Sequence, residues 1–172
     1  GQRWAPDLAE RWELTDDART FTFFLRKNAF WHDGEPVTAE DVAFTFKSYL
    51  TVESGSIHAA AFKMIKGAAD YQDGKTDEIS GIQVVDDHTI VFDMEKTNVV
   101  FVEAQNAASG GLTPVPILPE HLLGGIEHEK VARHPFFQEV MIGSGPFKFV
   151  KWVDDQFMEM VADDDFYFGR PK

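Results

Sequence analysis

The segment between residues 20 and 50 constrains the fold more than any other part of the chain. It opens with TFTFFLR, in which apolar and polar residues alternate as they do along a strand with one buried face. A few residues later, the letters HDGEP predict a turn, because Gly34 can adopt a positive φ and Pro36 lacks the backbone donor that a ladder needs. Apolar residues at helical spacing follow from about Thr38 to Leu50. The segment therefore predicts a strand, a tight turn and a helix in immediate succession.

A capping pattern strengthens the predicted start of this helix. Thr38 precedes Asp41 by three residues, which is a variant of the capping box. Glu40 and Asp41 fall in the first turn, where the helix dipole favours negative charge by ~0.3–1 kcal/mol. The apolar face of the predicted helix consists of Val42, Phe46, Tyr49 and Leu50.

The rest of the chain alternates short strands and helices without regular βαβ units. This pattern predicts an α+β fold with a mixed or antiparallel sheet and packed helices. Turn sequences such as TDDA and GSGP separate the predicted elements. In chain order we expect a hairpin at 8–26, a helix at 57–71, a hairpin at 82–94 with its turn at Asp86-Asp87, a helix at 98–109, a short helix opened by Pro119, and a final hairpin after Pro146 with its turn at Asp154-Asp155.

Composition excludes several classes of function. The 172 residues carry a formal charge of −13, so their field repels phosphate backbones and anionic membrane surfaces, and nucleic acid is not an expected partner. The absence of cysteine excludes disulfide scaffolds, thiolate metal sites and cysteine nucleophiles. No stretch approaches the ~20 consecutive apolar residues of a membrane span. The chain begins without Met and stops at FGRPK, so we expect it to be a fragment.

The densest group of chemically versatile side chains lies between residues 32 and 41. Imidazole and carboxylates are good metal ligands, so a metal-dependent hydrolase is the alternative function from another class. These acids, however, lie in a turn and in the first turn of a helix, where local roles account for them. We therefore expect a structural role, and no metal, for His32, Asp33, Glu35, Glu40 and Asp41.

Three further patterns give weak support for a site. DYQDGKTDE places oxygen ligands at positions 1 and 4 before the glycine, whereas an EF-hand loop needs positions 1, 3 and 5. GSGP lacks the lysine and the following helix of a phosphate loop. Ser-His-Asp catalysis is unsupported, because no nucleophile-elbow sequence surrounds any of the serines at 48, 54, 56, 80, 109 and 144.

Four stretches resemble the family 5 extracellular solute-binding proteins, the peptide- and nickel-type components of ABC importers. The longest is PDLAERWELTDDARTFTFFLRKNAFWHDGEPVTAEDVAFTF. ILPEHLL is similar to the family's I-V-P-K-H segment, IGSGPFKFVKWV to its G-T-G-P-Y segment, and DDDFYFGRPK to its N-x-x-Y-W-G-G-x-P segment. Together these stretches span nearly the whole chain in the family's order.

The resemblance implies part of the first lobe of a two-lobed, periplasmic-binding-protein-like (class II) fold that closes around a solute. In this interpretation, residues 1–133 form the family's extra subdomain of the first lobe. Residues 134–172 form returning strands of the first-lobe sheet, and the second lobe lies outside this chain.

The resemblance also implies a function without catalysis or cofactors. The expected role is to bind an oligopeptide or dipeptide outside the cytoplasm, in the periplasm or as a lipoprotein, and to deliver it to ABC permease subunits. A nickel complex, haem, opine or oligosaccharide is also compatible, and a purely structural interaction domain is a further alternative. The ligand-facing residues that the resemblance suggests, which could equally be surface positions at helix starts, are Ser56, His58, Phe62, Gln105, Asn106 and Ser109.

Overall fold

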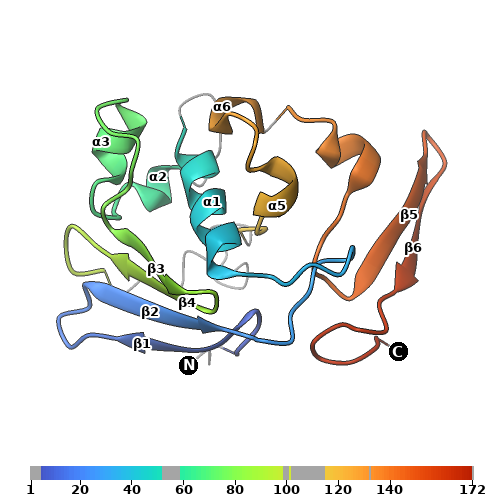
Figure 1. Cartoon of the computed structure of the whole chain (residues 1–172), viewed down its shortest axis with the longest axis horizontal. Coiled ribbons are helices and arrows are strands. Elements are labelled where there is room, and N and C mark those ends of the chain that lie inside the picture. The colour runs from blue at the N-terminus through green and yellow to red at the C-terminus, as the bar shows by residue number, and fades with distance from the viewer. Residues whose placement is uncertain (1–4, 52–58, 99–100, 102–114, 132, 172) are drawn as a thin grey trace.

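The computed structural model of the chain describes residues 5–51, 59–98, 101, 115–131 and 133–171. Its helices and strands confirm the predicted α+β class (Figure 1). In chain order they are β1 (Ala9–Leu14), β2 (Thr20–Leu25), α1 (Ala39–Leu50), α2 (Ala59–Phe62), α3 (Ala68–Gln72), β3 (Ile82–Asp86), β4 (Thr89–Asp93), α5 (Glu120–Leu123), α6 (His128–Val131), a π-helical turn (Phe136–Val140), β5 (Phe147–Val153) and β6 (Phe157–Ala162).

The first four strands form one antiparallel sheet in the order β1-β2-β4-β3. Each of the first two predicted hairpins is present, and they join where β2 pairs with β4, with Phe21 opposite Phe92. The alternation predicted for β2 is confirmed at Phe21 and Leu25, which are buried, whereas Thr22 between them is not. The sheet therefore has one face turned to a core and one turned outward.

Helix α1, with α2 and α3 beside it, covers the inner face of this sheet, whereas α5 and α6 pack on α1 (Figure 1). An aromatic cluster fills the space between the layers. The Phe46 ring of α1 lies 4.7 Å from Phe92 of β4 and 4.4 Å from Phe62 of α2, measured between ring centroids. Phe101 completes the cluster at 5.5 Å from Phe92. Apart from Asn98 and Phe101, the helix predicted at 98–109 lies outside the described residues.

The single helix predicted over 57–71 is wrong for the described part of that range. The structure has α2 and α3 instead, separated by a bend in which Ile65 forms a β-bridge with Met94 and Gly67 adopts a φ of +78°. That positive φ favours glycine, and a Cβ at Gly67 would also come within 3.0 Å of the Ser80 backbone nitrogen. The apolar spacing in this region therefore reflects a bend that returns to the core rather than a continuous helix.

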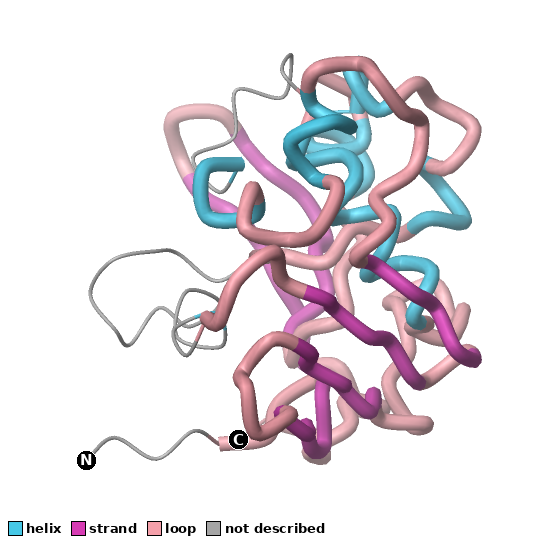
Figure 2. Tube along the Cα trace, turned by 90° about the vertical axis from the view of Figure 1, so that its left-hand side faces the viewer, coloured by secondary structure: helices cyan, strands magenta, loops and turns pink. Residues whose placement is uncertain are grey.

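Strands β5 and β6 form a separate two-stranded antiparallel sheet, the β5–β6 ribbon, at one end of the molecule (Figures 1 and 2). Its turn is the predicted one, with Asp155 at a φ of +55°. After the ribbon, the chain folds back to the first hairpin, where the Tyr167 hydroxyl donates a 2.6 Å hydrogen bond to Asp7. Partial burial, together with that bond, raises the pKa of Tyr167.

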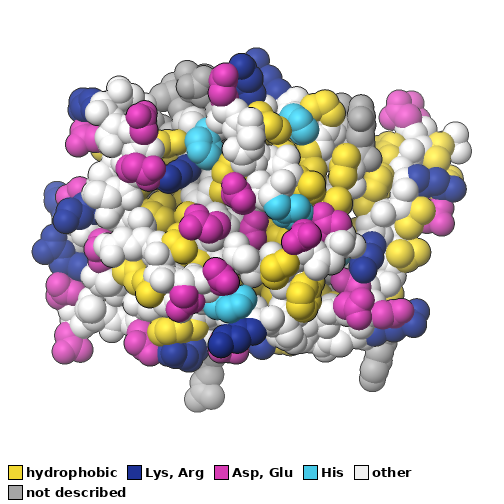
Figure 3. Space-filling model, viewed as in Figure 1, with side chains coloured by type: hydrophobic (Ala, Val, Ile, Leu, Met, Phe, Trp, Pro, Cys, Tyr) yellow, Lys and Arg dark blue, Asp and Glu magenta, His cyan; other side chains and the backbone are white. Residues whose placement is uncertain are grey.

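Acidic side chains are spread over the molecular face shown in Figure 3, as the net charge of −13 requires. Among the helices of the described residues, none has the length and apolar character needed to cross a membrane.

Candidate functional site

The N-terminus of α1 is organised around the carboxylate of Asp41, which is only 3% exposed. Its Oδ2 atom accepts hydrogen bonds from the Thr38 backbone N–H at 2.7 Å and from the Trp31 indole N–H at 3.2 Å. Its Oδ1 atom accepts from the backbone N–H of Glu120 at 2.7 Å. The predicted capping box is therefore confirmed, and the same carboxylate also binds the start of α5 to α1.

His32 connects the HDGEP turn to the glycine turn before β5. The Gly143 N–H donates to His32 Nδ1 at 3.2 Å, and His32 Nε2 lies 2.9 Å from the Gly145 carbonyl oxygen. These partners assign the imidazole proton to Nε2 and leave Nδ1 as the acceptor. A backbone hydrogen bond from the His32 N–H to the Gly143 carbonyl, at 2.8 Å, fixes the same two segments together. Both ring nitrogens are thus used in holding the structure.

Asp33 pairs with His121 of α5, whose Nε2 lies 2.8 Å from the Asp33 Oδ2 atom. Partial burial opposes ionisation of Asp33. The hydrogen bonds from His121 and from the Glu35 N–H outweigh that penalty, so the pKa of Asp33 lies below its ordinary value. The Asp33 carboxylate therefore has local partners of its own.

Residues 31–41, 117–123 and 142–146 thus meet in one place, which we call the motif junction. Each of these ranges belongs to one of the stretches on which the family resemblance rests. Across the described residues there is no group of three or more His, Asp or Glu side chains arranged to hold a metal ion. The imidazole and acids of the junction instead form hydrogen bonds with one another and with the backbone, which supports the structural interpretation.

A cavity of about 490 Å³ lies beside the motif junction. Lys148 at the start of β5 forms a 2.9 Å ion pair with Asp163, whose side chain is nearly buried. Burial opposes ionisation of Asp163, but Lys148 and the Asp165 N–H together keep its pKa below the ordinary value. The cavity is lined by Asn28, Phe30, Trp31, His32, Asp33, Gly34, Lys148, Asp163 and Asp165.

One serine does contact a histidine. Ser48 Oγ lies 2.8 Å from His128 Nδ1, and burial followed by the nearby Lys47 charge lowers the pKa of His128. Ser48, however, is buried within α1, and no carboxylate in the described part of the chain is recorded within hydrogen-bonding distance of His128. The pair therefore lacks both the access and the third group of a Ser-His-Asp site.

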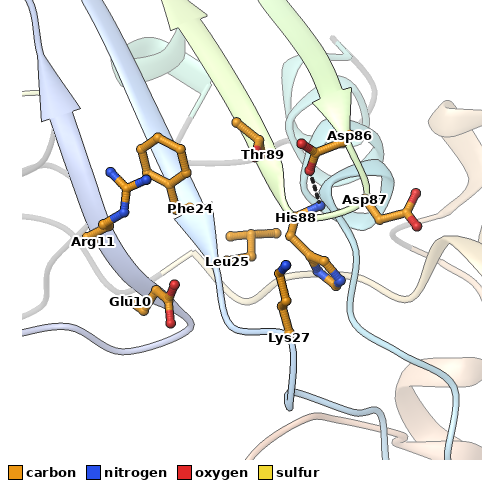
Figure 4. A pocket seen from close by; sticks show the side chains of 9 residues that line it. All are labelled: Glu10, Arg11, Phe24, Leu25, Lys27, Asp86, Asp87, His88 and Thr89. Carbon is orange, nitrogen blue, oxygen red and sulfur yellow. Dashed lines mark hydrogen bonds between the residues drawn. The ribbon is translucent and has the colours of Figure 1, made fainter.

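A second cavity, of about 460 Å³, lies at the end of the four-stranded sheet (Figure 4). Its side chains come from β1, β2 and the β3–β4 turn, and charges of both signs are mixed around it. Asp86 accepts the His88 backbone N–H at 2.8 Å, and Arg11 covers the Phe24 ring at 3.3 Å. Asp86 and Arg11 thus have local partners, whereas the buried His88 Nδ1 has no hydrogen-bond partner among the described residues, and no single ligand chemistry is favoured.

Most of the ligand-facing residues suggested by the resemblance lie outside the described residues, namely Ser56, His58, Gln105, Asn106 and Ser109. Phe62 is described, and its side chain is 0% exposed in the aromatic core. A contact between Phe62 and a solute would require this ring to leave its packing against Phe46. The ligand role of all six residues stays a prediction.

Sequence reasoning did not predict the contacts of His121, His128, Lys148 and Asp163. Their partners lie far along the chain, as with Asp33 and His121, which are 88 positions apart. The sequence signal for three of them was their place in stretches already singled out for resemblance: His121 in ILPEHLL, Lys148 in IGSGPFKFVKWV and Asp163 in DDDFYFGRPK.

Comparison with known proteins places the chain in a family. The model of the bacterial extracellular solute-binding proteins, family 5 (middle region), matches residues 3–172. A Brucella ovis protein whose name assigns it to ABC-transporter peptide binding is 34% identical over 96% of this chain. The oligopeptide-binding protein AppA of Bacillus subtilis is 27% identical over 95% of it. This chain spans only 27% and 26% of those two relatives, respectively.

Solved structures show the same architecture. NikZ from Campylobacter jejuni, in complex with Ni(L-His), matches 96% of this chain at 28% identity with a TM-score of 0.75. Bacillus subtilis AppA in complex with a nonapeptide matches 96% at 25% identity with a TM-score of 0.74. The chain covers 28% and 29% of these structures, respectively, which fits part of one lobe of a class II binding protein.

Proposed function

This chain belongs to the family 5 bacterial extracellular solute-binding proteins, and from that membership we propose that it is part of a peptide-binding component of an ABC importer. The observation that carries the proposal is the 34% identity, over 96% of the chain, with a relative named for peptide binding. The whole protein would bind an oligopeptide or dipeptide outside the cytoplasm and deliver it to the membrane subunits of a permease. It would be either free in the periplasm or anchored as a lipoprotein.

The chain's place in that protein is also part of the proposal. Residues 1–133 would form the extra subdomain of the first lobe, and residues 134–172 would be returning strands of the first-lobe sheet. The motif junction supports this division, because the His32 side chain contacts Gly143 and Gly145 across the boundary, and residues of both parts line the cavity beside it. The junction would fix the orientation of the extra subdomain on the lobe.

Peptide recognition would then depend on hydrogen-bonding groups of the cleft that pair with the backbone of an extended peptide. An extended peptide presents N–H and C=O groups that strands and loops of a cleft can pair, while roomy pockets accept varied side chains. In this chain the proposed contributions come from Ser56, His58, Phe62, Gln105, Asn106 and Ser109. Most of the cleft would be supplied by the remainder of the protein.

The absence of catalysis is proposed on chemical grounds. His32, Asp33 and Asp41 would be the natural candidates for a hydrolase, yet each is occupied by hydrogen bonds within the motif junction. A general base must instead be free to reach a substrate proton. The proposed function therefore uses these groups only to hold the fold.

A metal complex is the second candidate solute. The similarity to a protein solved with Ni(L-His) supports it, at an identity no lower than that to the nonapeptide-bound relative. Both candidates would bind in the cleft between lobes, so both predict binding by the full-length protein.

Calorimetric titration of the full-length gene product with a mixed-sequence oligopeptide library, and separately with Ni²⁺ plus L-histidine, tests the proposal. We expect saturable peptide binding and much weaker binding by these 172 residues alone. Binding of Ni(L-His) without peptide binding would favour the second candidate. Full-strength peptide binding by the isolated chain would contradict the proposed division of the cleft.

A further inference from the structure

The β5–β6 ribbon has two faces of different character. In an antiparallel pair, residues directly opposite each other share a face, and alternate residues along a strand change faces. The observed register therefore assigns three cross-strand pairs to one face, with a bulge at Val150 keeping them aligned. This face, which we call the apolar ribbon face, contains only hydrophobic side chains: Phe147 opposite Ala162, Phe149 opposite Met160, and Trp152 opposite Met158.

The opposite ribbon face carries charge. Lys151 and Glu159 form a cross-strand ion pair with 3.0 Å between Nζ and Oε2. Lys148 is on the same face and reaches Asp163. Val161, Val153 and Phe157 complete this face, which is therefore amphipathic rather than purely apolar.

The apolar ribbon face is uncovered in this chain. Trp152 is 55% exposed and Met160 is 47% exposed, and Figure 3 shows hydrophobic side chains gathered along the ribbon. A hairpin of two strands is marginal in water unless a third strand or a packed layer supports it. An exposed apolar face of this kind marks an interaction surface.

We propose that the apolar ribbon face is an internal interface, covered in the full-length protein by an apolar layer from the same polypeptide outside these 172 residues. This inference rests on the proposed function for the division of the protein into lobes. The occupant would bring hydrophobic side chains against Trp152 and Met160, and it would leave the Lys151–Glu159 side accessible to water.

Two observations favour this occupant over a second copy of the chain. First, the chain spans 26–29% of relatives and solved structures that match nearly all of it, so proteins of this family contain a large additional part that could cover the face. Second, each copy carries a net charge of −13, and that charge opposes close approach of two copies. A covering segment of the same polypeptide also binds at high effective concentration.

Thiol labelling tests the proposal directly, because the 172 residues contain no cysteine. Met160→Cys and Val161→Cys are introduced separately into the full-length protein, and peptide mass spectrometry follows maleimide modification at each position. Met160 and Val161 are neighbours on β6 with equal exposure in this chain, 47% and 49%, but they lie on opposite faces. We expect labelling at position 160 to be at least ~10-fold slower than at position 161, and unchanged on dilution.

Every other outcome overturns the inference, and each one indicates a different state of the apolar ribbon face. Equal labelling at the two positions would mean that the face stays exposed. Protection at position 160 that disappears on ~100-fold dilution would mean that a second copy covers it. Met158→Cys compared with Glu159→Cys repeats the test if the first pair fails to fold. The readout needs no solute, so a protein that binds no peptide could still show the protection, which separates this inference from the proposed function.

Discussion

Asp33 and His121, 88 positions apart in the chain, are joined by a 2.8 Å contact between a carboxylate oxygen and an imidazole nitrogen. The contact connects the HDGEP turn to α5, and its two residues belong to separate stretches of the family resemblance. Two stretches that lie far apart in the sequence thus meet in space. The side chains that look catalytic in the sequence here hold segments of the fold together.

A double-mutant cycle on Asp33→Asn and His121→Gln measures this contact. Both side chains are about one-quarter exposed, so we expect a coupling free energy of only about 0.5–1 kcal/mol from urea unfolding. Because the pKa of Asp33 is lowered in the fold, its contribution is present above the ordinary value of 3.8 and is lost as pH falls through the folded value. Strictly additive effects of the two substitutions at neutral pH would show that the residues are neighbours without interacting.

Asp41→Ala should destabilise the protein far more than its neighbour Glu40→Ala. Removal of the Asp41 carboxylate leaves the Trp31 indole N–H and the Glu120 backbone N–H without their acceptor, and we expect a loss of about 3 kcal/mol in the free energy of unfolding. Glu40 is exposed in the same helical turn, where only the dipole contribution of ~0.3–1 kcal/mol is lost. Denaturant titration measures the free energy of unfolding of both variants. Equal losses would contradict the role of the Asp41 carboxylate as a shared hydrogen-bond acceptor.

His32→Ala separates the structural role from an enzymatic one. The substitution removes the acceptor of the Gly143 N–H and the partner of the Gly145 carbonyl, so we expect a loss of about 1–2 kcal/mol in the free energy of unfolding. Peptide affinity of the folded full-length variant should stay within about twofold of the parent. A hydrolytic activity in the parent that disappears in a stably folded His32→Ala variant would reverse the interpretation.

Sequence reasoning succeeded where structure depends on neighbours in the chain. The Thr38–Asp41 capping box, the alternation of β2 and the Asp154-Asp155 turn are encoded by residues a few positions apart. It failed at Gly67, because the bend there depends on Ser80 and on the strand pairing of Met94. No pattern of neighbouring residues in the sequence predicts such a distant contact.

The same physical limit applies to the contacts that join α5 and α6 to α1. Spacing alone could not show that Asp41 also accepts a hydrogen bond from Glu120, or that His128 lies against Ser48. Both contacts arise only when α5 and α6 pack on α1. The family resemblance identified the right segments without indicating which of their atoms would meet.

Stability should rise with pH through the range in which His128 titrates. Burial lowers the pKa of the folded His128 below its ordinary value of 6.5, with a smaller contribution from Lys47 that Glu78 opposes. The unfolded chain therefore binds the proton first as pH falls below 6.5, and the free energy of unfolding decreases until the folded pKa is passed. Above 6.5 this contribution is complete. Urea unfolding between about pH 5 and about pH 8 measures it.

The control for this pH dependence is His128→Gln, which keeps a polar partner near Ser48 but cannot titrate. Subtracting its pH profile from that of the parent removes the contributions of the other histidines. We expect the difference to slope in the stated direction below pH 6.5 and to be flat above it. A difference profile that is flat throughout, or that slopes the other way, would exclude a depressed pKa at His128.

Gly67→Ala and Gly74→Ala form a matched pair that tests the bend between α2 and α3. Both glycines have positive φ, +78° and +69°, so each substitution carries a backbone strain of about 1–2 kcal/mol. At Gly74 nothing lies within 4 Å of the added Cβ, whereas at Gly67 the Cβ would meet the Ser80 Oγ at 2.7 Å and its backbone nitrogen at 3.0 Å. Because backbone cannot move aside as a side-chain tip can, we expect Gly67→Ala to cost about 1–3 kcal/mol more than Gly74→Ala in thermal or urea unfolding. Equal costs would mean that Ser80 and the start of β3 shift freely, and the bend would then be a consequence of the glycine alone rather than of its contact with Ser80.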